Sequence, residues 1–191
     1  WSKYPGIHLI PPAWLSLPRM KKTLKNIRHL SLAEIETFFV ELGEKKFRAK
    51  QVYEWLWQKG ALSFADMTNL SKDLRQKLGE TFSFPALTVN STQYSADGTV
   101  KTGFKTFDGH LVEGVLIPTE KRYTACVSSQ IGCSLSCKFC ATGYIDRKRN
   151  LNFDEIYDEV VLINQQSERI YNHKLTNIVF RGMGEPLLNY K

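Results

Sequence analysis

Three cysteines close together in the chain are the residues best suited to chemistry. Cys133, Cys137 and Cys140 have the spacing C-x3-C-x2-C, and no cysteine follows them. A structural zinc site is normally closed by a fourth Cys or a His at ligand spacing. Three thiolates suit a 4Fe–4S cluster better, because they can bind three irons and leave the fourth open to a non-protein ligand. The spacing therefore favours such a cluster, whose open iron is what binding and reductive cleavage of S-adenosylmethionine (SAM) requires.

Spacing alone leaves two alternatives open, a zinc loop without its last ligand and three ordinary buried thiols. All four cysteines of the chain lie between Cys126 and Cys140. A disulfide framework would spread its cysteines in order to join distant segments, so this clustering points to a metal or redox site in a reducing compartment. We therefore expect a cytoplasmic protein.

Two residues upstream of the cysteine motif could take part in the same chemistry. Cys126 is either a buried apolar thiol in a strand or a redox-active thiol that resolves a covalent intermediate. Glu113 lies in the apolar run Leu111–Ile117 and is either an exposed strand residue or a general base. From the residues alone, the structural interpretation is favoured for both.

A glycine-rich segment, Gly182–Pro186, follows a run that is typical of a buried strand. Its glycines would let a ligand approach the backbone, and Glu185 or the backbone beside it could accept a hydrogen bond from a ligand ammonium. Glycine-rich strand ends are common turns, so the segment means little by itself. Together with the cysteine loop it suggests two arms, one for the cluster and one for the amino acid part of SAM.

Composition favours a globular protein with a polyanionic partner. The chain has 191 residues, an apolar fraction of 42% and a net charge of +7. The basic excess favours RNA as a partner. No apolar run approaches the roughly 18 residues of a membrane span, so we expect no membrane association. Residues 1–22 contain several prolines and a basic run, and we treat them as a tail or tag without fixed structure.

The first half of the remaining chain predicts helices. Ser31–Glu34 reads as a capping box, a second helix is expected at about 48–59, and Ser71 begins a third. We therefore predict a helical domain at 23–84. The second helix carries basic residues and aromatics that could grip phosphates and stack on unpaired bases, or form a core with a basic face. These residues are Lys45, Lys46, Arg48, Lys50, Tyr53, Trp55 and Trp57.

The second half predicts strands and one helix. Alternating runs at 87–94, 99–106 and 110–118 are separated by Asp-Gly dipeptides, which indicate hairpins. A strand at 123–128 leads into the cysteine loop, a helix from Asn152 follows, and a buried strand is expected at 174–181. Strand, loop, helix and strand form a βα repeat, which points to a parallel sheet or barrel with ligands at the carboxyl ends of its strands.

Taken together, these segments resemble the RlmN/Cfr family of radical-SAM RNA methyltransferases. The resemblance covers roughly residues 23–191 and is most specific around the cysteines. It implies an α/β fold: a small helical domain, an antiparallel meander and, within residues 85–191, the first part of a partial radical-SAM barrel. The matching segments are Val112–Pro118, Cys126–Cys133, the cysteine motif through Gly143, and Gly182–Asn189.

The resemblance also implies an activity and roles for single residues. Proteins of this family methylate an adenine ring carbon of 23S rRNA, and the housekeeping branch acts on C2 and also on certain tRNAs. Cys133, Cys137 and Cys140 would hold the cluster, and Gly184 and Glu185 would contact SAM. Glu113 would accept a proton. Cys126 would release the product through a transient disulfide with a methyl-carrying cysteine.

That second cysteine lies beyond the present residues, because none follows Cys140 before the chain stops at Lys191. We therefore expect an N-terminal fragment, monomeric and inactive on its own, from an enzyme that uses an external electron donor such as a flavodoxin-like protein. The resistance-type branch, which methylates C8 of the same adenine, and a non-catalytic zinc and RNA-binding module are the alternatives.

Overall fold

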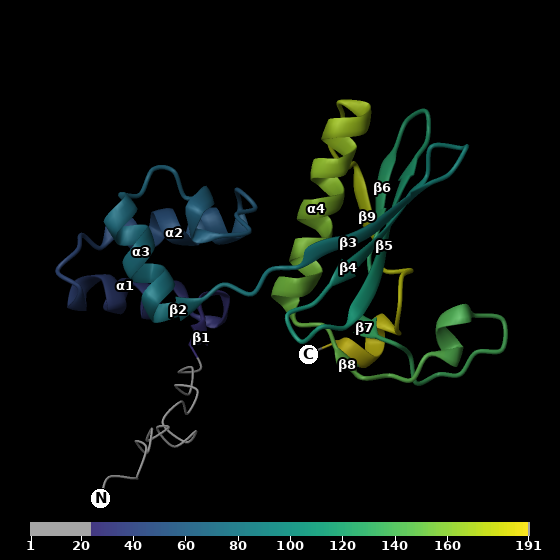
Figure 1. The fold of residues 1–191 in the computed structure, drawn as a ribbon, viewed down its shortest axis with the longest axis horizontal. Helices are drawn as coiled ribbons and strands as arrows, with labels where there is room; N and C mark the ends of the chain where they lie inside the picture. The colour runs from purple at the N-terminus through teal and green to yellow at the C-terminus, as the bar shows by residue number, and fades with distance from the viewer. Residues whose placement is uncertain (1–23, 191) are drawn as a thin grey trace, which may run out of the picture.

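The computed structural model describes residues 24–190, in which a helical module (residues 24–84) is followed by a sheet module (residues 85–190; Figure 1). The predicted tail at 1–22 lies outside the described residues. No helix in the described part is long and apolar enough to cross a membrane. The helical module consists of β1 (Lys25–Asn26), η2 (Ile27–His29), α1 (Leu32–Glu41), α2 (Phe47–Trp57), η3 (Phe64–Asp66), α3 (Lys72–Thr81) and β2 (Phe82–Ser83).

Two helices of the first module, α1 and α3, begin at the serine caps that the sequence predicts, and α2 begins at Phe47 without a side-chain cap. The Ser31 backbone N–H donates to the Glu34 carboxylate at 2.7 Å, and the Glu34 N–H donates back to Ser31 Oγ at 3.3 Å. Ser71 Oγ accepts from the Leu74 N–H at 3.2 Å and opens α3. The apolar faces meet in one core that contains Phe39 and Leu78, both fully buried. The three predicted helices are therefore confirmed.

The sheet module contains five strands in the order β3-β4-β5-β6-β9. The first four pair antiparallel, and β9 pairs parallel with β6. Gly98 and Gly109 sit in the two predicted hairpin turns with φ of 85° and 84°, a conformation that glycine adopts without strain. The strands are β3 (Thr88–Tyr94), β4 (Val100–Lys105), β5 (Leu111–Pro118), β6 (Tyr123–Cys126) and β9 (Asn177–Val179).

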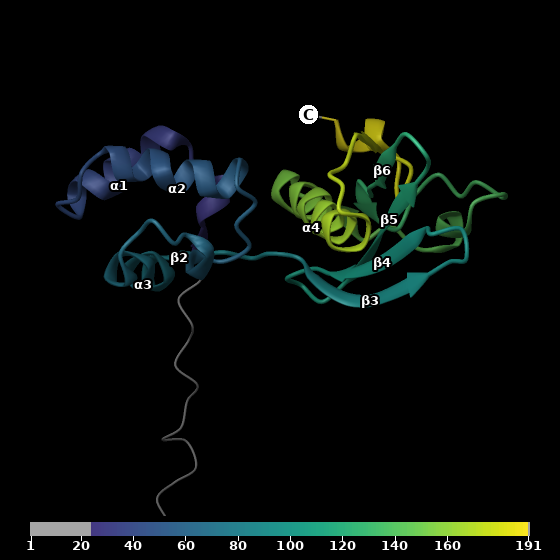
Figure 2. The same ribbon diagram turned by 90° about the horizontal axis from the view of Figure 1, so that it is seen from above.

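One long helix, α4 (Phe153–Tyr171), covers one face of this sheet (Figures 1 and 2). Side chains alternate between the two faces of a strand, so the buried residues of β5, Val112 and Leu116, face α4 and pack in a core with Ile163. Glu113, between them in the sequence, therefore points to the opposite face. The sheet face away from α4 therefore carries Glu113 and is not covered by this helix.

The predicted buried strand at 174–181 is wrong in its length and its burial. Only Asn177–Val179 pair as β9, and Ile178 and Phe180 are each 48% exposed. The apolar run suggested a strand covered on both faces. Instead, β9 lies at the edge of the sheet, and among the described residues only β6 pairs with it.

A buried ion pair joins the two modules. Arg28 donates to both carboxylate oxygens of Asp158 on α4, at 2.7 and 3.0 Å, and both side chains are fully buried. Arg28 Nη1 also donates to the Asp154 carbonyl at 3.0 Å. Beside this pair, the ring of Trp57 packs against Tyr157 at a centroid distance of 5.3 Å. These contacts set the position of the helical module on α4.

Candidate functional site

The cysteine loop (residues 132–143) extends from the sheet on the side away from α4 (Figures 1 and 2). Its base is closed by β7 (Gln130–Ile131), which pairs antiparallel with β8 (Arg149–Asn150). The Cys133 N–H also donates to the Ile145 carbonyl at 3.1 Å. At the first turn, Gly132 has a φ of 74°, and a Cβ there would lie 2.2 Å from the Asp146 carbonyl oxygen. Only glycine fits this position.

The three thiols of the loop are free and partly exposed. Hydrogen bonding from the backbone N–H groups of Thr142 and Gly143 lowers the pKa of Cys140, which favours the thiolate that a metal needs. Among the described residues, no three His, Cys, Asp or Glu side chains gather closely enough to hold one metal ion. A 4Fe–4S cluster takes each thiolate on a different iron, so the donor set fits a cluster in the type and number of its ligands.

The glycine-rich turn after β9 is bonded to the chain that leads into the cysteine loop. The Ser129 N–H donates to the Met183 carbonyl at 2.9 Å, and the Met183 N–H donates to Ser128 Oγ at 2.8 Å. Gly184 has a φ of 92°, and a Cβ on it would lie 2.5 Å from Gln130 Cβ. The close approach explains why glycine is needed here. The glycine-rich turn and the start of the cysteine loop are therefore held together by Ser128, Ser129 and Gln130.

Glu185 follows this turn and is held at two points. Its N–H donates to Gln130 Oε1 at 3.0 Å, and its carboxylate accepts from the Leu187 N–H at 3.0 Å. The second bond caps the short helix η5 (Pro186–Asn189). The backbone of Gly184 and Glu185 is thus fixed beside the base of the cysteine loop.

A pocket of about 460 Å³ brings three of the predicted segments together. Glu113 enters it from β5, Thr142 from the cysteine loop and Met183 from the glycine-rich turn. Glu113 is half exposed, and its carboxylate forms an ion pair with Lys101 Nζ at 2.8 Å. The remaining lining residues are His110, Leu111, Ile131, Ala141, Ile145 and Lys148. The pocket is therefore an apolar hollow with one carboxylate and several basic groups.

Cys126 lies at the end of β6, opposite Val115 of β5 and Val179 of β9 in the register. Strand alternation puts its side chain on the same sheet face as Glu113, because the preceding Ala125 packs in the core under α4. The thiol is 7% exposed, and burial raises its pKa. Cys126 is thus near the site in the sheet, but it does not line the pocket.

Within the basic run Arg147–Arg149, Arg147 and Lys148 are exposed, whereas Arg149 is partly buried. Arg149 donates to Asp108 at 2.7 Å and to Glu155 at 2.6 Å, and so joins the β4–β5 turn to the start of α4. The pKa of Asp108 is held far below its ordinary value, chiefly by the hydrogen bonds from Arg149. The guanidinium has two carboxylate partners and serves the fold.

Sequence reasoning also missed Lys101 and Glu159. Lys101 reads as an ordinary exposed strand residue, and only the register places it beside Glu113. Glu159 is fully buried on α4, where its carboxylate accepts from the Ser128 N–H at 2.8 Å. Burial raises the pKa of Glu159 well above its ordinary value. In the sequence, the buried position of Glu159 is indicated only by its place on the apolar face of the predicted helix.

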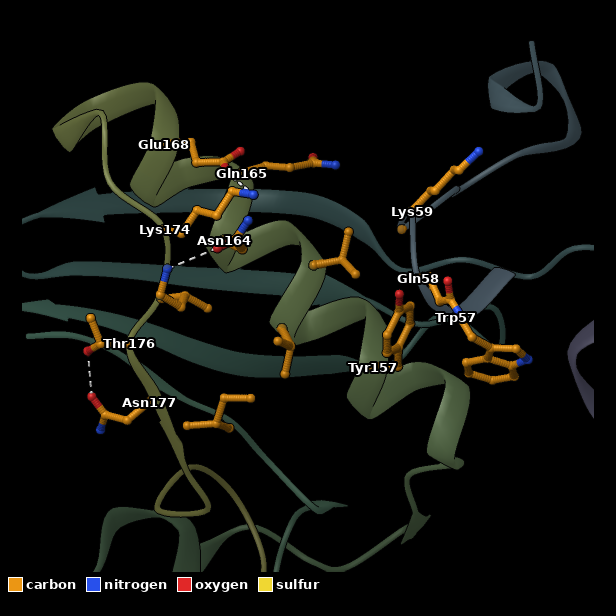
Figure 3. Close-up of a pocket in the computed structure, with 15 residues that line it drawn as sticks. Trp57, Gln58, Lys59, Tyr157, Asn164, Gln165, Glu168, Lys174, Thr176 and Asn177 are labelled. Carbon is orange, nitrogen blue, oxygen red and sulfur yellow. Dashed lines mark hydrogen bonds and ion pairs between the residues drawn. The ribbon is translucent and has the colours of Figure 1, made fainter. Parts of the chain in front are cut away.

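A larger hollow, of about 660 Å³, lies between the end of α2 and the α4–β9 side of the sheet module (Figure 3). Trp57 and Lys59 line it from the helical module, and Tyr157 lines it from α4. On the far side Asn164 Oδ1 accepts from the Leu175 N–H at 3.0 Å. Apart from Trp57, a candidate RNA contact, none of the predicted residues lines this hollow, and none of the predicted catalytic, SAM-binding or cluster-binding residues does. Size therefore does not identify the functional pocket.

Known proteins resemble this chain over most of its length. The family model described as the ribosomal RNA large subunit methyltransferase N-terminal domain matches residues 25–83. A protein of Cytophaga hutchinsonii named probable dual-specificity RNA methyltransferase RlmN is 62% identical over 87% of this chain and 46% of its own length. A Geotalea uraniireducens protein named dual-specificity RNA methyltransferase RlmN is 46% identical over 87% of this chain and 47% of its own length.

A solved structure supports the same relationship. The crystal structure of a radical SAM methyltransferase from Sphaerobacter thermophilus matches with a TM-score of 0.76 and 39% identity, over 87% of this chain and 49% of that chain. This likeness confirms the α/β fold class that the sequence predicts. The present chain spans about half the length of the curated relatives that it matches. By its matched domain, its identity to these relatives and its fold, the chain belongs to the RlmN family.

Proposed function

We propose that this chain contributes the cluster-binding half of a radical-SAM enzyme that methylates C2 of an adenine in 23S rRNA and in certain tRNAs. The observation that carries the proposal is the pocket that joins Glu113, the cysteine loop and the glycine-rich turn. Relatives named dual-specificity RNA methyltransferase share this part of the chain at up to 62% identity. The names of these relatives describe RNA as the substrate, and we assign RNA substrates to this chain as part of the proposal.

The cofactors follow from the donor set. Cys133, Cys137 and Cys140 would hold a 4Fe–4S cluster, and the backbone of Gly184 and Glu185 would contact SAM. When bound, the cluster would supply the electron that cleaves SAM reductively. The loop contributes a fixed glycine turn at its base and N–H groups that favour the Cys140 thiolate. An external donor, such as a flavodoxin-like protein, would deliver the electron in the cytoplasm.

Two residues of the sheet would act on the substrate. Glu113 would accept the proton from the adenine ring carbon, because it is the one carboxylate among the residues that line the pocket. Cys126 would attack the sulfur of a methyl-carrying cysteine supplied by the rest of the protein. That attack forms a transient S–S bond and breaks the S–C bond to the RNA, and the carbon takes the electron pair and a proton to become the methyl group.

The helical module would bind the RNA. Lys45, Lys46 and Lys50 are exposed around the start of α2, and basic side chains of this kind neutralise phosphates. Trp55 is half-buried, and its indole N–H donates to Asn69 Oδ1. It is therefore a packed residue of the module, and the lysines carry the RNA-binding role. We expect a monomer.

The test compares two preparations after anaerobic reconstitution with iron, sulfide and SAM. One is the present 191-residue chain. The other, called here the completed protein, is this chain followed by the part of the Cytophaga hutchinsonii relative that it does not match. We expect both to bind iron and sulfide and to change their visible spectrum on addition of SAM. Only the completed protein should give methyladenosine in 23S rRNA and tRNA.

Several outcomes would contradict the proposal. A colourless protein that binds zinc in place of iron and sulfide would favour the non-catalytic alternative. A product that co-elutes with 8-methyladenosine, and not with 2-methyladenosine, would move the protein to the resistance-type branch. Methylation by the 191-residue chain alone would show that it needs no second cysteine. The control is the completed protein with Cys133, Cys137 and Cys140 changed to alanine, which should carry no cluster.

A further inference from the structure

Lys101 and Glu113 form an ion pair on the sheet face away from α4. Lys101 Nζ lies 2.8 Å from Glu113 Oε1. In the antiparallel register Lys101 pairs with Val115 and Glu113 pairs with Gly103, so the two charged residues are diagonal neighbours on adjacent strands. Diagonal neighbours on one face are within reach of long side chains. The pairing therefore follows from the strand register and needs no special backbone.

The pair is part of the pocket. Lys101 and Glu113 both line the hollow, together with Thr142 of the cysteine loop and Met183 of the glycine-rich turn. The other groups in the lining that can carry a positive charge are His110 and Lys148, but neither is within ion-pair distance of Glu113 in the described structure. Lys101 is thus the cation that holds this carboxylate.

A carboxylate in this position needs a partner to be useful. The side chains of Lys101 and Glu113 are 46% and 49% exposed, so packing does not fix their rotamers. A free glutamate would divide its time among several rotamers, and only some of them put the carboxylate in the pocket. An ammonium on the neighbouring strand selects one of these arrangements. Gly103, which is paired with Glu113, has no side chain of its own beside the carboxylate, and a Cβ there would lie 2.7 Å from Ser91 Oγ.

We propose that Lys101 is a positioning residue for Glu113, holding its carboxylate in the pocket between the cysteine loop and the glycine-rich turn. The role rests on the proposed function, in which Glu113 accepts a proton from the substrate carbon. In that step the C–H bond breaks, its electron pair stays with the ring, and the proton goes to a carboxylate oxygen of Glu113. The carboxylate loses its charge, and the ion pair with Lys101 is released.

The contact is tested first, without any activity. A water-soluble carbodiimide joins a paired amine and carboxylate as an amide, and peptide mass spectrometry of the 191-residue chain would locate the product. We expect an amide between Lys101 and Glu113. Lys25 and Glu34, an exposed pair at 3.2 Å, serve as the positive control. Cross-linking of the control pair without any Lys101–Glu113 product would overturn the proposal.

The role is tested next, in the completed protein. Lys101→Met should lower kcat about 10- to 100-fold with little change in the KM for RNA, a share of the 10²–10⁴-fold that a placed general base contributes. Lys101→Arg should recover much of this loss, since it keeps the charge. Lys105→Met is the matched control, because Lys105 lies on the same strand and face, is exposed and forms no ion pair among the described residues. Its kcat should equal that of the unchanged protein.

The double variant Lys101→Met/Glu113→Gln separates positioning from other roles. If Lys101 acts through Glu113, the double variant should be no slower than Glu113→Gln alone. If the losses in kcat from the two single variants multiply in the double variant, Lys101 acts independently of Glu113 and the positioning role is refuted. A rise in the KM for RNA with unchanged kcat in Lys101→Met would likewise make Lys101 a contact to the RNA. An unchanged completed protein that gives no methyladenosine would instead refute the proposed function, and the cross-link would still report on the contact.

Discussion

Removing Arg28 tests how the two modules are held together. The substitution Arg28→Met keeps an unbranched side chain in place and removes the guanidinium. Asp158, which is fully buried, would lose both of its bonds from Arg28 and keep only the one from the Leu87 N–H at 3.0 Å. The Asp154 carbonyl would lose its bond from Arg28. The change therefore leaves a buried carboxylate without a counter-charge.

The magnitude follows from that uncompensated charge. Breaking a buried ion pair by removing one partner costs about 3–5 kcal/mol. The Arg28 guanidinium also lies 4.5 Å from the centroid of the Phe84 ring, and a desolvated cation–π contact adds about 1–2 kcal/mol. The free energy of unfolding of a typical domain is only about 5–15 kcal/mol. Arg28→Met should therefore lower the urea midpoint strongly.

The assay is urea unfolding, followed by circular dichroism and by tryptophan fluorescence, since Trp57 lies in the contact between the modules. The control is Lys25→Met, which removes the exposed pair with Glu34 and should cost about 0–1 kcal/mol. The double variant Arg28→Met/Asp158→Leu should recover most of the loss, because apolar replacement of a whole buried pair is often close to neutral. A loss below about 1 kcal/mol for Arg28→Met, against the 3–5 kcal/mol expected of a buried pair, would refute the reasoning.

Three further predictions concern the site and its supports. Gly184→Ala should cost about 1–3 kcal/mol, measured by thermal unfolding, because φ is positive and Gln130 blocks the new Cβ; a wild-type melting temperature would contradict this. The folded pKa of Asp108 is depressed, so its pair with Arg149 stabilises the fold above the unfolded pKa of about 3.8 and this stability is lost as the pH falls below it. Asp108→Asn should therefore lower stability at pH 7 and flatten its decline below pH 4, and equal acid profiles would argue against it. At pH 7 iodoacetamide should modify Cys140 faster than Cys126, because backbone N–H groups lower the pKa of one thiol and burial raises that of the other; the reverse order by peptide mass spectrometry would contradict the assignment.

Local signals in the sequence correctly predicted the elements that carry the site. The Ser31 cap and the two Asp-Gly turns act within a few residues, so their effect does not depend on the rest of the fold. The cysteine spacing similarly defines a short loop whose base is fixed by Gly132. Binding of a cluster by that loop stays a prediction, as do the roles of Glu113, Cys126, Gly184 and Glu185.

Features that depend on strand neighbours were harder to predict. The run at 174–181 has the composition of a buried strand, yet β9 is short and half exposed because of its place at the sheet edge. Arg149 binds Asp108, which is distant in the sequence, and nothing in the segment around Arg149 indicates this partner. In both cases the deciding partner lies far away along the chain.

The sequence by itself determined which residue types are available: three closely spaced thiols, paired glycines after a strand, and a glutamate within a β-rich run. Only the tertiary structure decided which of these share a pocket. Strand register put Lys101 beside Glu113 and left Cys126 outside the pocket lining. Register depends on pairing across the whole sheet, because a shift by one residue would move every side chain to the other face. The register therefore cannot be predicted from any single segment of the sequence.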